Sequence, residues 1–421
     1  MQMRKYKLGD IATVEISGVD KKIKDGEEDI RLCNFVDVYY NWAITMARHD
    51  SFMLATARPN EISKFQLKKG QVALTKDSET RDDIGISTYI ADDFNDVILG
   101  YHCALITPNK DILDGRYLNA LMHTGYAKKY FAFNASGSGQ RYALSAETLN
   151  SFPVPVIPLQ KQKQIGEIFS ALDKKIELNK QINQNLEAMA KQLYDYWFVQ
   201  FDFPDENGKP YKSSGGKMVW NDKLKREIPE GWDDGILIDI ANITMGQSPD
   251  GSSYNEVGEG MLFYQGSTDF GMRFPSVRQY TTAPSRFAKK GDILMSVRAP
   301  VGSINIANND CCIGRGLSAI NSKLDSISHL YYILNDLRIA FDQRNAAGTT
   351  FGSITKEDLY SLPIIIPSDE VIRAFDKICS PMFDRQMILG EEIDILTKQR
   401  DELLPLLMNG QVSVNSDLSR D

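Results

Sequence analysis

The chain of 421 residues has an ordinary globular composition, with 42% hydrophobic and 25% charged residues, and its formal net charge is −8. Its length predicts at least two domains, and nowhere does it reach the roughly 18 consecutive apolar residues of a membrane span. Five cysteines without framework spacing, and an N-terminus without a signal-peptide core, favour a cytoplasmic protein with no membrane partner.

Residues 1–158 are predicted to form a mixed α/β domain. Apolar runs at Val72–Thr75 and His102–Thr107 are typical of strands, and polar loops separate them. A helix is expected from Gly115 to Phe133, where apolar residues recur near helical spacing. His102 lies in an apolar run and is expected to be a hydrogen-bonded core residue rather than a metal ligand.

Residues 159–200 are predicted to form one long helix, entered after Pro158. Apolar residues alternate in steps of three and four, which is the pattern of a heptad seam, and Asn179 is a polar residue at an a-type position. The expected seam consists of Ile165, Ile168, Leu172, Asn179, Ile182, Leu186, Met189, Leu193 and Tyr196.

The second half of the chain follows the same plan. Residues 201–232 are a polar connector in which a small hairpin is expected. Residues 233–367 repeat the mixed α/β pattern, and residues 368–410 form a second long helix before a frayed tail at 411–421. The seam of that second helix is expected at Leu389, Ile393, Leu396, Leu403 and Leu407, with Arg400 between them.

These two halves are repeats of each other in sequence. ETLNSFPVPVIP, which contains Glu147, returns as EDLYSLPIIIP with Glu357, 210 residues later (357 − 147) and half the 421-residue chain. LKKGQVALTK is matched by AKKGDILMSV, and LGDIA by LIDIA. The repeat predicts a pseudo-two-fold α/β (α+β) protein: two mixed α/β domains separated by two long helices that pack antiparallel as a coiled coil. Packing of each helix against its own domain remains an alternative.

Motifs of common enzymes are missing from the sequence. There is no GxxxxGK[ST] phosphate loop, no GxGxxG, no HExxH and no GxSxG. The chain also contains no Pro-Pro pair, so it lacks the Asn/Asp-Pro-Pro-aromatic motif of amino-methyltransferases. Adjacent Cys311 and Cys312 are better explained by a buried strand than by a metal. A duplicated chain without these motifs favours a binding protein that reads two sites.

Two segments carry a resemblance to a known family. The stretch from Ser170 to Trp220 resembles the central conserved region of the specificity subunits of type I restriction-modification systems, the HsdS family, and Thr397 to Val414 resembles its distal conserved region. The resemblance implies that residues 1–158 and 233–367 are target recognition domains, each reading one part of a bipartite asymmetric DNA site, while the helices set the spacer.

The resemblance also implies which partners and cofactors to expect. The chain would be a non-catalytic subunit that binds double-stranded DNA and two methyltransferase subunits, and optionally restriction/translocase subunits. No cofactor is expected in this chain, because S-adenosylmethionine, and ATP and Mg for restriction, would be bound by the partner subunits. The net charge of −8 opposes DNA binding unless cations cluster locally or a partner supplies them.

Candidate DNA contacts are cationic and amide side chains in polar loops, because Arg and Gln can bond bidentately to guanine and adenine edges while Lys suits phosphates. Arg81 and Arg298 are compared most directly, since each follows the strand after a shared glycine, Gly70 or Gly291. The candidates are Arg58, Lys64, Lys76, Arg81, Gln140 and Arg141 in the first domain and Gln247, Arg273, Arg278, Arg286, Arg298, Arg315 and Thr349 in the second.

An aromatic run at the end of the first long helix is a candidate partner anchor, with local core as its alternative explanation. It comprises Tyr194, Tyr196, Trp197, Phe198, Phe201 and Phe203. Two other functions remain open: a coiled-coil scaffold that presents two domains to protein partners without binding DNA, and an enzyme with an unrecognised site. Salt-dependent DNA affinity distinguishes the first of these from a DNA reader.

Overall fold

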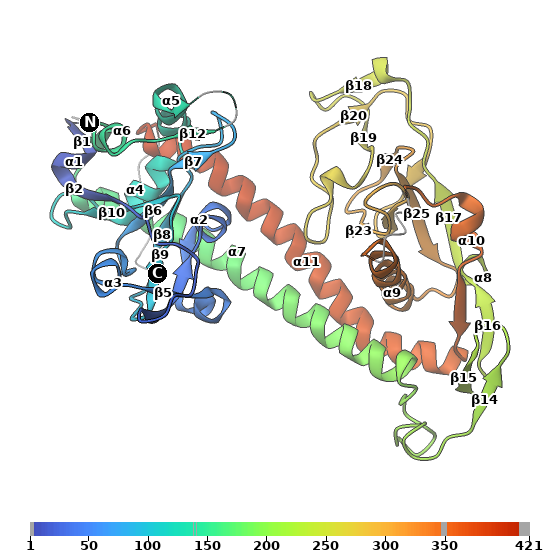
Figure 1. The fold of residues 1–421 in the computed structure, drawn as a ribbon. Helices are drawn as coiled ribbons and strands as arrows, with labels where there is room; N and C mark the ends of the chain where they lie inside the picture. The colour runs from blue at the N-terminus through green and yellow to red at the C-terminus, as the bar shows by residue number, and fades with distance from the viewer. Residues whose placement is uncertain (1–3, 138, 140, 347–351, 412–421) are drawn as a thin grey trace, which may run out of the picture. The chain divides into compact units, whose positions relative to one another are not determined.

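A computed structural model of the chain describes residues 4–137, 139, 141–346 and 352–411. It divides into two compact units, which we call unit 1 (Met1–Glu177 and Ile395–Asp421) and unit 2 (Leu178–Asp394). Each unit contains a mixed α/β globule and a stretch of each of the two long helices, α7 (Leu159–Tyr194) and α11 (Asp369–Met408) (Figure 1). The predicted fold class is confirmed.

The globule of unit 1 is built on a sheet whose central strands come from the apolar runs seen in the sequence. β10 (Cys103–Pro108) is antiparallel to both of its neighbours, and one of these, β6 (Val72–Thr75), is buried along its whole length. The sheet has the order β2 (Ala12–Ile16), β10, β6, β8 (Ser87–Ile90) and β4 (Ala43–Ile44). A second sheet has the order β5 (Met53–Ala57), β3 (Glu28–Cys33) and β9 (Val97–Leu99).

Short elements complete unit 1. The start and end of the globule lie side by side, because β1 (Arg4–Lys7) pairs antiparallel with β13 (Pro153–Val156). A small third sheet has the order β11 (Ser136–Gly137), β12 (Tyr142–Ala143) and β7 (Asp77–Ser78). The short helices are α1 (Leu8–Ile11), α2 (Phe35–Tyr40), α3 (Pro59–Phe65) and α6 (Ala146–Asn150), with a 3-10 turn at Met46–Ser51.

The single helix expected from Gly115 to Phe133 is wrong, because the structure has two helices there. They are α4 (Gly115–Met122) and α5 (Gly125–Asn134). The break is at Thr124, whose backbone is extended and whose hydroxyl accepts a hydrogen bond from the amide of Ala127. Thr124 is therefore the N-cap of a new helix, and the apolar residues on both sides of it made the two helices look like one.

Unit 2 repeats this architecture with different accessory strands. Its main sheet has the order β17 (Ala241–Met245), β25 (Leu317–Ser322), β22 (Ile293–Ser296) and β23 (Ile304–Ile306). The second sheet has the order β18 (Tyr254–Asn255), β20 (Tyr280–Thr281), β19 (Met261–Tyr264), β24 (Cys311–Ile313) and β21 (Phe287–Ala288). Both cysteines of β24 are buried, as expected for a core strand.

The remaining elements of unit 2 frame its globule. β16 (Asp233–Ile236) pairs antiparallel with β26 (Pro363–Ile366), as β1 does with β13. The hairpin expected in the connector is present as β14 (Met218–Asn221) and β15 (Arg226–Pro229). The helices are α8 (Leu237–Ile240), α9 (Ile327–Ala346) and α10 (Lys356–Tyr360), with 3-10 turns at Gly251–Ser253 and Ser267–Asp269.

Within unit 2 the two long helices run antiparallel. The Gln386 amide on α11 donates to the carbonyl of Asn183 at 3.3 Å and to Glu187 at 3.0 Å, and the ring of Phe375 lies 6.3 Å from that of Tyr194. Residue numbers therefore fall along α11 as they rise along α7. Within unit 1, Ile165 and Phe169 of α7 share a core with the end of α11, namely Leu404, Leu407 and Met408.

The seam predicted for α7 is half correct. Ile165 and Asn179 are buried as expected, but Met189 is 53% exposed and the adjacent Ala190 is buried instead. One line of buried residues recurs every seven positions along the helix, and it consists of Gln162, Phe169, Ile176, Asn183, Ala190 and Trp197. Polar Gln162 and Asn183 occupy two of these positions, so hydrophobicity alone shifts the seam by one residue. In α11, Leu389 and Leu407 of the expected seam are buried, whereas Ile393, Leu396 and Leu403 are half-buried, so that seam is confirmed in part.

A π-helical turn, Asp195–Val199, continues α7, and Phe201, two residues beyond its end, has a left-handed backbone with a φ of 66°. Among the described residues, none of the helices combines the length and apolar character needed to cross a membrane.

Candidate nucleic-acid interface

Unit 1 contains an open cleft of about 630 Å³ beside its third, small sheet. One wall is the aromatic end of α2, where Asn34 and Asp37 form a capping box that fixes the start of the helix. The other wall comes from the loop after β7 and from the residues around His102 and Arg141. The lining is Phe35, Val36, Tyr39, Tyr40, Asp77, Ser78, Glu79, Thr80, Asp83, His102 and Arg141.

A chain of charged and polar groups crosses this cleft. The Asp77 carboxylate accepts a hydrogen bond from Lys76 Nζ at 2.7 Å and contacts Nδ1 of His102. Arg141 Nη2 lies 3.2 Å from Nε2 and 3.4 Å from Nδ1 of His102, which places it over the face of the imidazole rather than in line with one ring nitrogen. Burial raises the pKa of the Asp77 carboxyl, but the hydrogen bonds from Lys76 and His102 outweigh it and hold that pKa below its usual range. With the proton on Nδ1, His102 donates to Asp77, while Arg141 packs against the face of the same ring.

His102 is therefore not the core residue expected from the sequence. It adopts a left-handed backbone, with φ at 69°, directly before β10, and this turns its ring out of the strand and into the cleft. Its ring lies 3.8 Å from that of Tyr101. The apolar residues that follow His102 are typical of a strand, and they do not reveal the left-handed backbone that places His102 in a loop instead.

The other cationic candidates of unit 1 are divided between the cleft and elsewhere. Arg81 lies near the cleft, because its guanidinium is 5.0 Å from the ring of Tyr142, in the strand that pairs with β7. Arg58, the N-cap of α3, forms an ion pair with Glu27 at 3.5 Å, and Lys64 on α3 forms one with Glu15 at 3.3 Å. Gln140 lies outside the described residues, as does Thr349 of the second domain.

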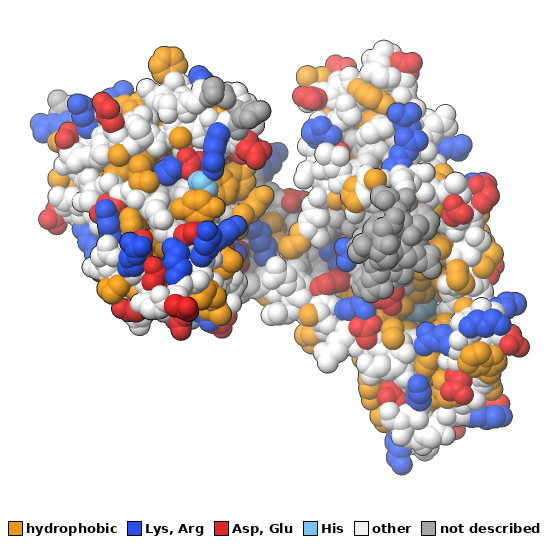
Figure 2. Space-filling model, in the orientation of Figure 1, with side chains coloured by type: hydrophobic (Ala, Val, Ile, Leu, Met, Phe, Trp, Pro, Cys, Tyr) orange, Lys and Arg blue, Asp and Glu red, His pale blue; other side chains and the backbone are white. Residues whose placement is uncertain are grey.

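In Figure 2, Lys and Arg side chains form a band across the viewer-facing side of unit 1, with hydrophobic side chains between them. A local cationic surface thus exists in a chain whose net charge is −8.

Three candidates of unit 2 are brought together by backbone hydrogen bonds. The amide of Gln247 donates to the carbonyl of Ile313 at 3.0 Å, and the amide of Ile313 donates to the carbonyl of Arg286 at 2.9 Å. The amide of Arg315, two residues further on, donates to the hydroxyl of Ser248 at 3.2 Å. The side chains of Gln247, Arg286 and Arg315 are all exposed.

Arg315 is presented by a tightly packed turn. A Cβ at Gly314 would lie 2.8 Å from the side-chain oxygen of Gln265, and one at Gly316 would lie 2.6 Å from the Gln265 carbonyl. Gln265 also donates to Ser248 at 2.8 Å. The two glycines therefore let the backbone lie against Gln265, which leaves Arg315 as the side chain that projects from the turn.

Arg273 does not lie on the surface, contrary to its selection as a DNA contact. Its side chain is 6% exposed, donates to Glu187 of α7 at 2.8 Å, and lies between the rings of Phe383 and Tyr331 at 4.5 and 4.9 Å. Arginine suits such a buried, stacked position, and sequence does not distinguish this use from base reading. Arg278 remains 60% exposed while paired with Asp269 at 2.8 Å.

Arg298 has a structural counterpart, but it is not Arg81. Arg298 bridges antiparallel to Ser353, and the amide of Ile354 donates to the carbonyl of Val297 at 2.9 Å. In unit 1 the same pattern joins Asp77 to Ala143, with the amide of Leu144 donating to Lys76 at 2.8 Å. Asp77 and Arg298 therefore occupy equivalent positions, and each lies seven residues after its glycine (77 − 70 and 298 − 291).

The aromatic run at the end of α7 forms core rather than an exposed anchor. Tyr194, Trp197, Phe198, Phe201 and Phe203 are buried, and only Tyr196, at 37%, is exposed. They pack with aromatic residues of unit 2, namely Trp232, His329, Tyr332 and Phe375.

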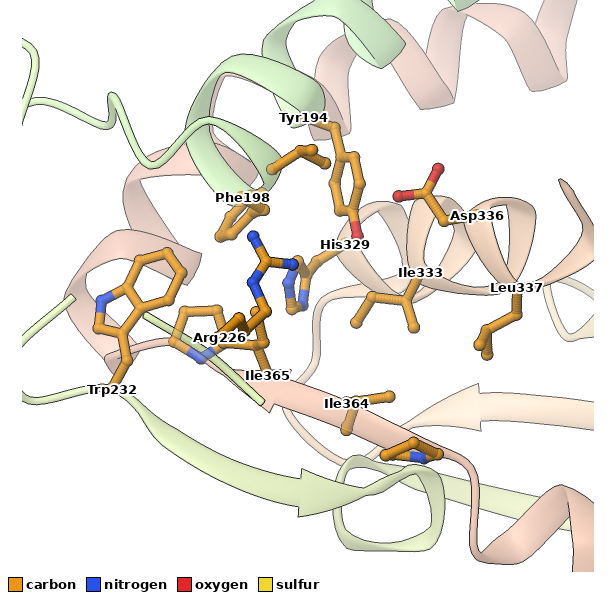
Figure 3. A pocket seen from close by; sticks show the side chains of 13 residues that line it. Tyr194, Phe198, Arg226, Trp232, His329, Ile333, Asp336, Leu337, Ile364 and Ile365 are labelled. Carbon is orange, nitrogen blue, oxygen red and sulfur yellow. The ribbon is translucent and has the colours of Figure 1, made fainter. Parts of the chain in front are cut away.

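Beside this cluster lies a pocket of about 210 Å³, around which Figure 3 shows Tyr194, Phe198, Trp232 and His329. Burial lowers the pKa of His329 to about 3, so its imidazole is neutral in this apolar surrounding.

Comparisons with known proteins agree with this architecture. The family described as Type I restriction modification DNA specificity domain matches residues 2–188 and 229–396. The type I restriction enzyme MjaX specificity subunit of Methanocaldococcus jannaschii is similar to this chain, with 31% identity over 370 residues, 85% of this chain and 82% of that protein. The MjaIX specificity subunit of the same organism is 28% identical over 323 residues, 72% of this chain and 71% of its own length.

Among solved structures, the crystal structure of a type I restriction-modification S subunit from M. genitalium is similar with a TM-score of 0.60 and 14% identity, covering 96% of each chain. At this identity the likeness concerns the fold alone.

Proposed function

The chain belongs to the family of type I restriction modification DNA specificity domains and is a DNA sequence-specificity subunit of such a system, and we propose that each of its units reads one half of a bipartite, asymmetric DNA site. The observation that carries this proposal is the repeat. The two family matches fall one in each half of the chain, and each half has its own sheet, its own core and its own loop cluster with exposed guanidinium groups. Two similar domains suit two half-sites.

The spacing between the half-sites is assigned to the long helices. α7 begins in unit 1 and ends in unit 2, and α11 begins in unit 2 and ends in unit 1. A helix rises about 1.5 Å per residue, so helix length is a suitable physical measure of spacer length.

Methyl transfer and cleavage are assigned to partner subunits. In this proposal the chain binds double-stranded DNA and two methyltransferase subunits, which hold S-adenosylmethionine, and optionally restriction/translocase subunits, which use ATP and Mg. The net charge of −8 supports a shared interface, because DNA binding requires cationic surface and the 48 Lys and Arg of this chain are outnumbered by 56 Asp and Glu, so that partners can supply further cations.

A domain exchange tests the proposal. Residues 1–158 are replaced by the equivalent segment of a relative, and methylated adenines are mapped across the host genome by sequencing. We expect one half of the methylated motif to change, while the other half and the spacer stay the same. A swap that rewrites both halves would contradict independent reading, and a strain that methylates no bipartite motif with the wild-type chain would favour the scaffold alternative.

A further inference from the structure

The side chains that line the cleft of unit 1 are suited to binding the edge of a base pair rather than a phosphate. Its lining combines the guanidinium of Arg141 with three carboxylates, those of Asp77, Glu79 and Asp83. Carboxylates repel a phosphate, but they accept hydrogen bonds from the exocyclic amine of cytosine, while arginine donates two to guanine. Hydrogen bonding from Tyr39 to Asp83 at 2.8 Å, which raises the pKa of Tyr39 to about 12, fixes one carboxylate on the aromatic wall.

The loop that carries His102 is repeated in unit 2. In unit 1 the amide of Gly100 donates to the carbonyl of Cys33 at 2.8 Å, and the amide of Ser17 donates to that of Cys103 at 3.0 Å. The matching bonds in unit 2 run from Gly314 to Tyr264 at 2.8 Å and from Gly246 to Leu317 at 2.9 Å. Both loops have three residues, Gly100–His102 and Gly314–Gly316, so both units present a guanidinium at or beside the same loop: Arg141 in unit 1 and Arg315 in unit 2.

Resting on the proposed function, we infer that the unit 1 cleft reads a guanine–cytosine pair through Arg141, and that His102 is the positioning residue that orients Arg141. The Asp77 carboxylate fixes the imidazole, and Arg141 Nη2 lies over the face of that ring, 3.2 Å from Nε2 and 3.4 Å from Nδ1. An arginine held in one orientation can present its planar fork to guanine O6 and N7 with less loss of side-chain freedom than an unrestrained one. Tyr40 and Val36, 74% and 55% exposed, form the apolar rim of the same reading site.

The test uses the full chain in its host with its native partners, and maps methylated adenines across the genome. Arg141→Lys keeps the charge but removes the planar fork, and Arg141→Ala removes both. Both are expected to relax one base position in the half-site read by unit 1, by roughly 5- to 150-fold in discrimination, the range for an arginine–guanine contact. A matched control is Lys110→Ala, an exposed lysine beyond the opposite end of β10, which is expected to leave the motif unchanged.

His102 is tested with variants that suit its left-handed backbone. His102→Gly removes the ring without backbone strain, because glycine adopts the left-handed conformation freely, and is expected to relax the same base position as Arg141→Ala, but less. His102→Asn tolerates this backbone and offers a planar amide in place of the imidazole face, and is expected to restore part of the discrimination. Thermal unfolding of each variant complex accompanies the mapping, since a merely structural role would lower stability without altering the motif.

The inference fails separately from the proposed function. If the wild-type chain directs a bipartite motif but both Arg141 variants leave every position unchanged, the cleft does not read a base. If Arg141→Ala instead weakens methylation at all sites alike while Arg141→Lys is neutral, Arg141 contacts a phosphate and the inference is wrong. Relaxation at a different position by His102→Gly would overturn the positioning role.

Discussion

Units 1 and 2 share their backbone framework but not the chemistry of their loops. The amide of Leu8 donates to the carbonyl of Phe152 at 2.9 Å, and that of Leu237 to Leu362 at the same distance. Yet at the equivalent positions after β6 and β22, unit 1 has the carboxylate of Asp77 and unit 2 has the guanidinium of Arg298. Main-chain bonds depend little on side-chain identity, so the framework can persist while the exposed loops change charge. This is what a protein reading two different half-sites requires.

The sharpest test of this comparison concerns the two cores. Phe169 in unit 1 and Phe375 in unit 2 are 1% and 0% exposed, and each belongs to the core cluster of its own unit. Replacing either with alanine leaves a cavity and is expected to cost about 3–5 kcal/mol. Hydrogen exchange followed by mass spectrometry is expected to show the loss of protection mainly in the unit that carries the substitution. Equal loss in both units for both variants would mean that the cores are one cooperative structure.

A smaller loss of folding stability is expected when the pH is lowered. His123 of unit 1 is half-buried and His329 of unit 2 is buried, and burial lowers the pKa of His123 to about 4 and that of His329 to about 3. Their folded pKa values lie below the unfolded value of about 6.5, so the unfolded chain takes up the protons first as pH falls. Stability is therefore lost below about pH 6.5, down to about pH 4 for His123 and about pH 3 for His329.

The expected slope is about 1.4 kcal/mol per pH unit for each histidine. Denaturant unfolding at a series of pH values measures it. In the wild-type chain, His123 Nε2 lies 2.9 Å from the Ser87 carbonyl, and His123→Gln keeps a donor for that carbonyl. His329→Leu fills its pocket with a side chain that does not titrate. Each variant is expected to remove one part of the slope between pH 6.5 and 4. An unchanged slope in either variant would show that its histidine is not neutral when folded.

Sequence predicted the repeated framework well, because its signals are local and strong. Helical periodicity located α7 and α11, and short apolar runs located β6 and β10. It failed where polar residues occupy buried positions: Asn183, 3% exposed, lies on the buried stripe of α7 and shifted the predicted seam. Thr124 hid a helix boundary, because its hydroxyl caps α5 by accepting from the amide of Ala127, and hydrophobic periodicity does not record such a cap.

The candidate site could be predicted only in part. Arg141 and Arg315 were chosen for their residue type and lie in exposed loops, but His102 was assigned to the core, because its left-handed backbone is invisible in an apolar run. Arg81 was matched with Arg298 by counting from shared glycines, whereas strand pairing shows that Asp77 is the counterpart of Arg298. Arg273, buried against Glu187, shows the general limit: the same side chain serves DNA binding and core packing, and only tertiary structure separates the two.

The finest test of the shared framework uses its two equivalent glycines. Gly70 and Gly291 have φ angles of 97° and 93°, and a Cβ at either would have nothing within 4 Å. Their amides donate to Ile90 and Ala307, at 3.0 and 2.8 Å. The next strand begins two residues later in both units, at Val72 and Ile293.

Alanine at either glycine is therefore penalised by backbone conformation alone, by about 1–2 kcal/mol for a left-handed residue. Gly70→Ala and Gly291→Ala are expected to cost the same within a few tenths of a kcal/mol, measured by denaturant unfolding of each variant. Because there is no steric contact to differ between the sites, a large difference would mean that the two turns carry different strain. The shared framework would then hold in its hydrogen-bond pattern but not in its energetics.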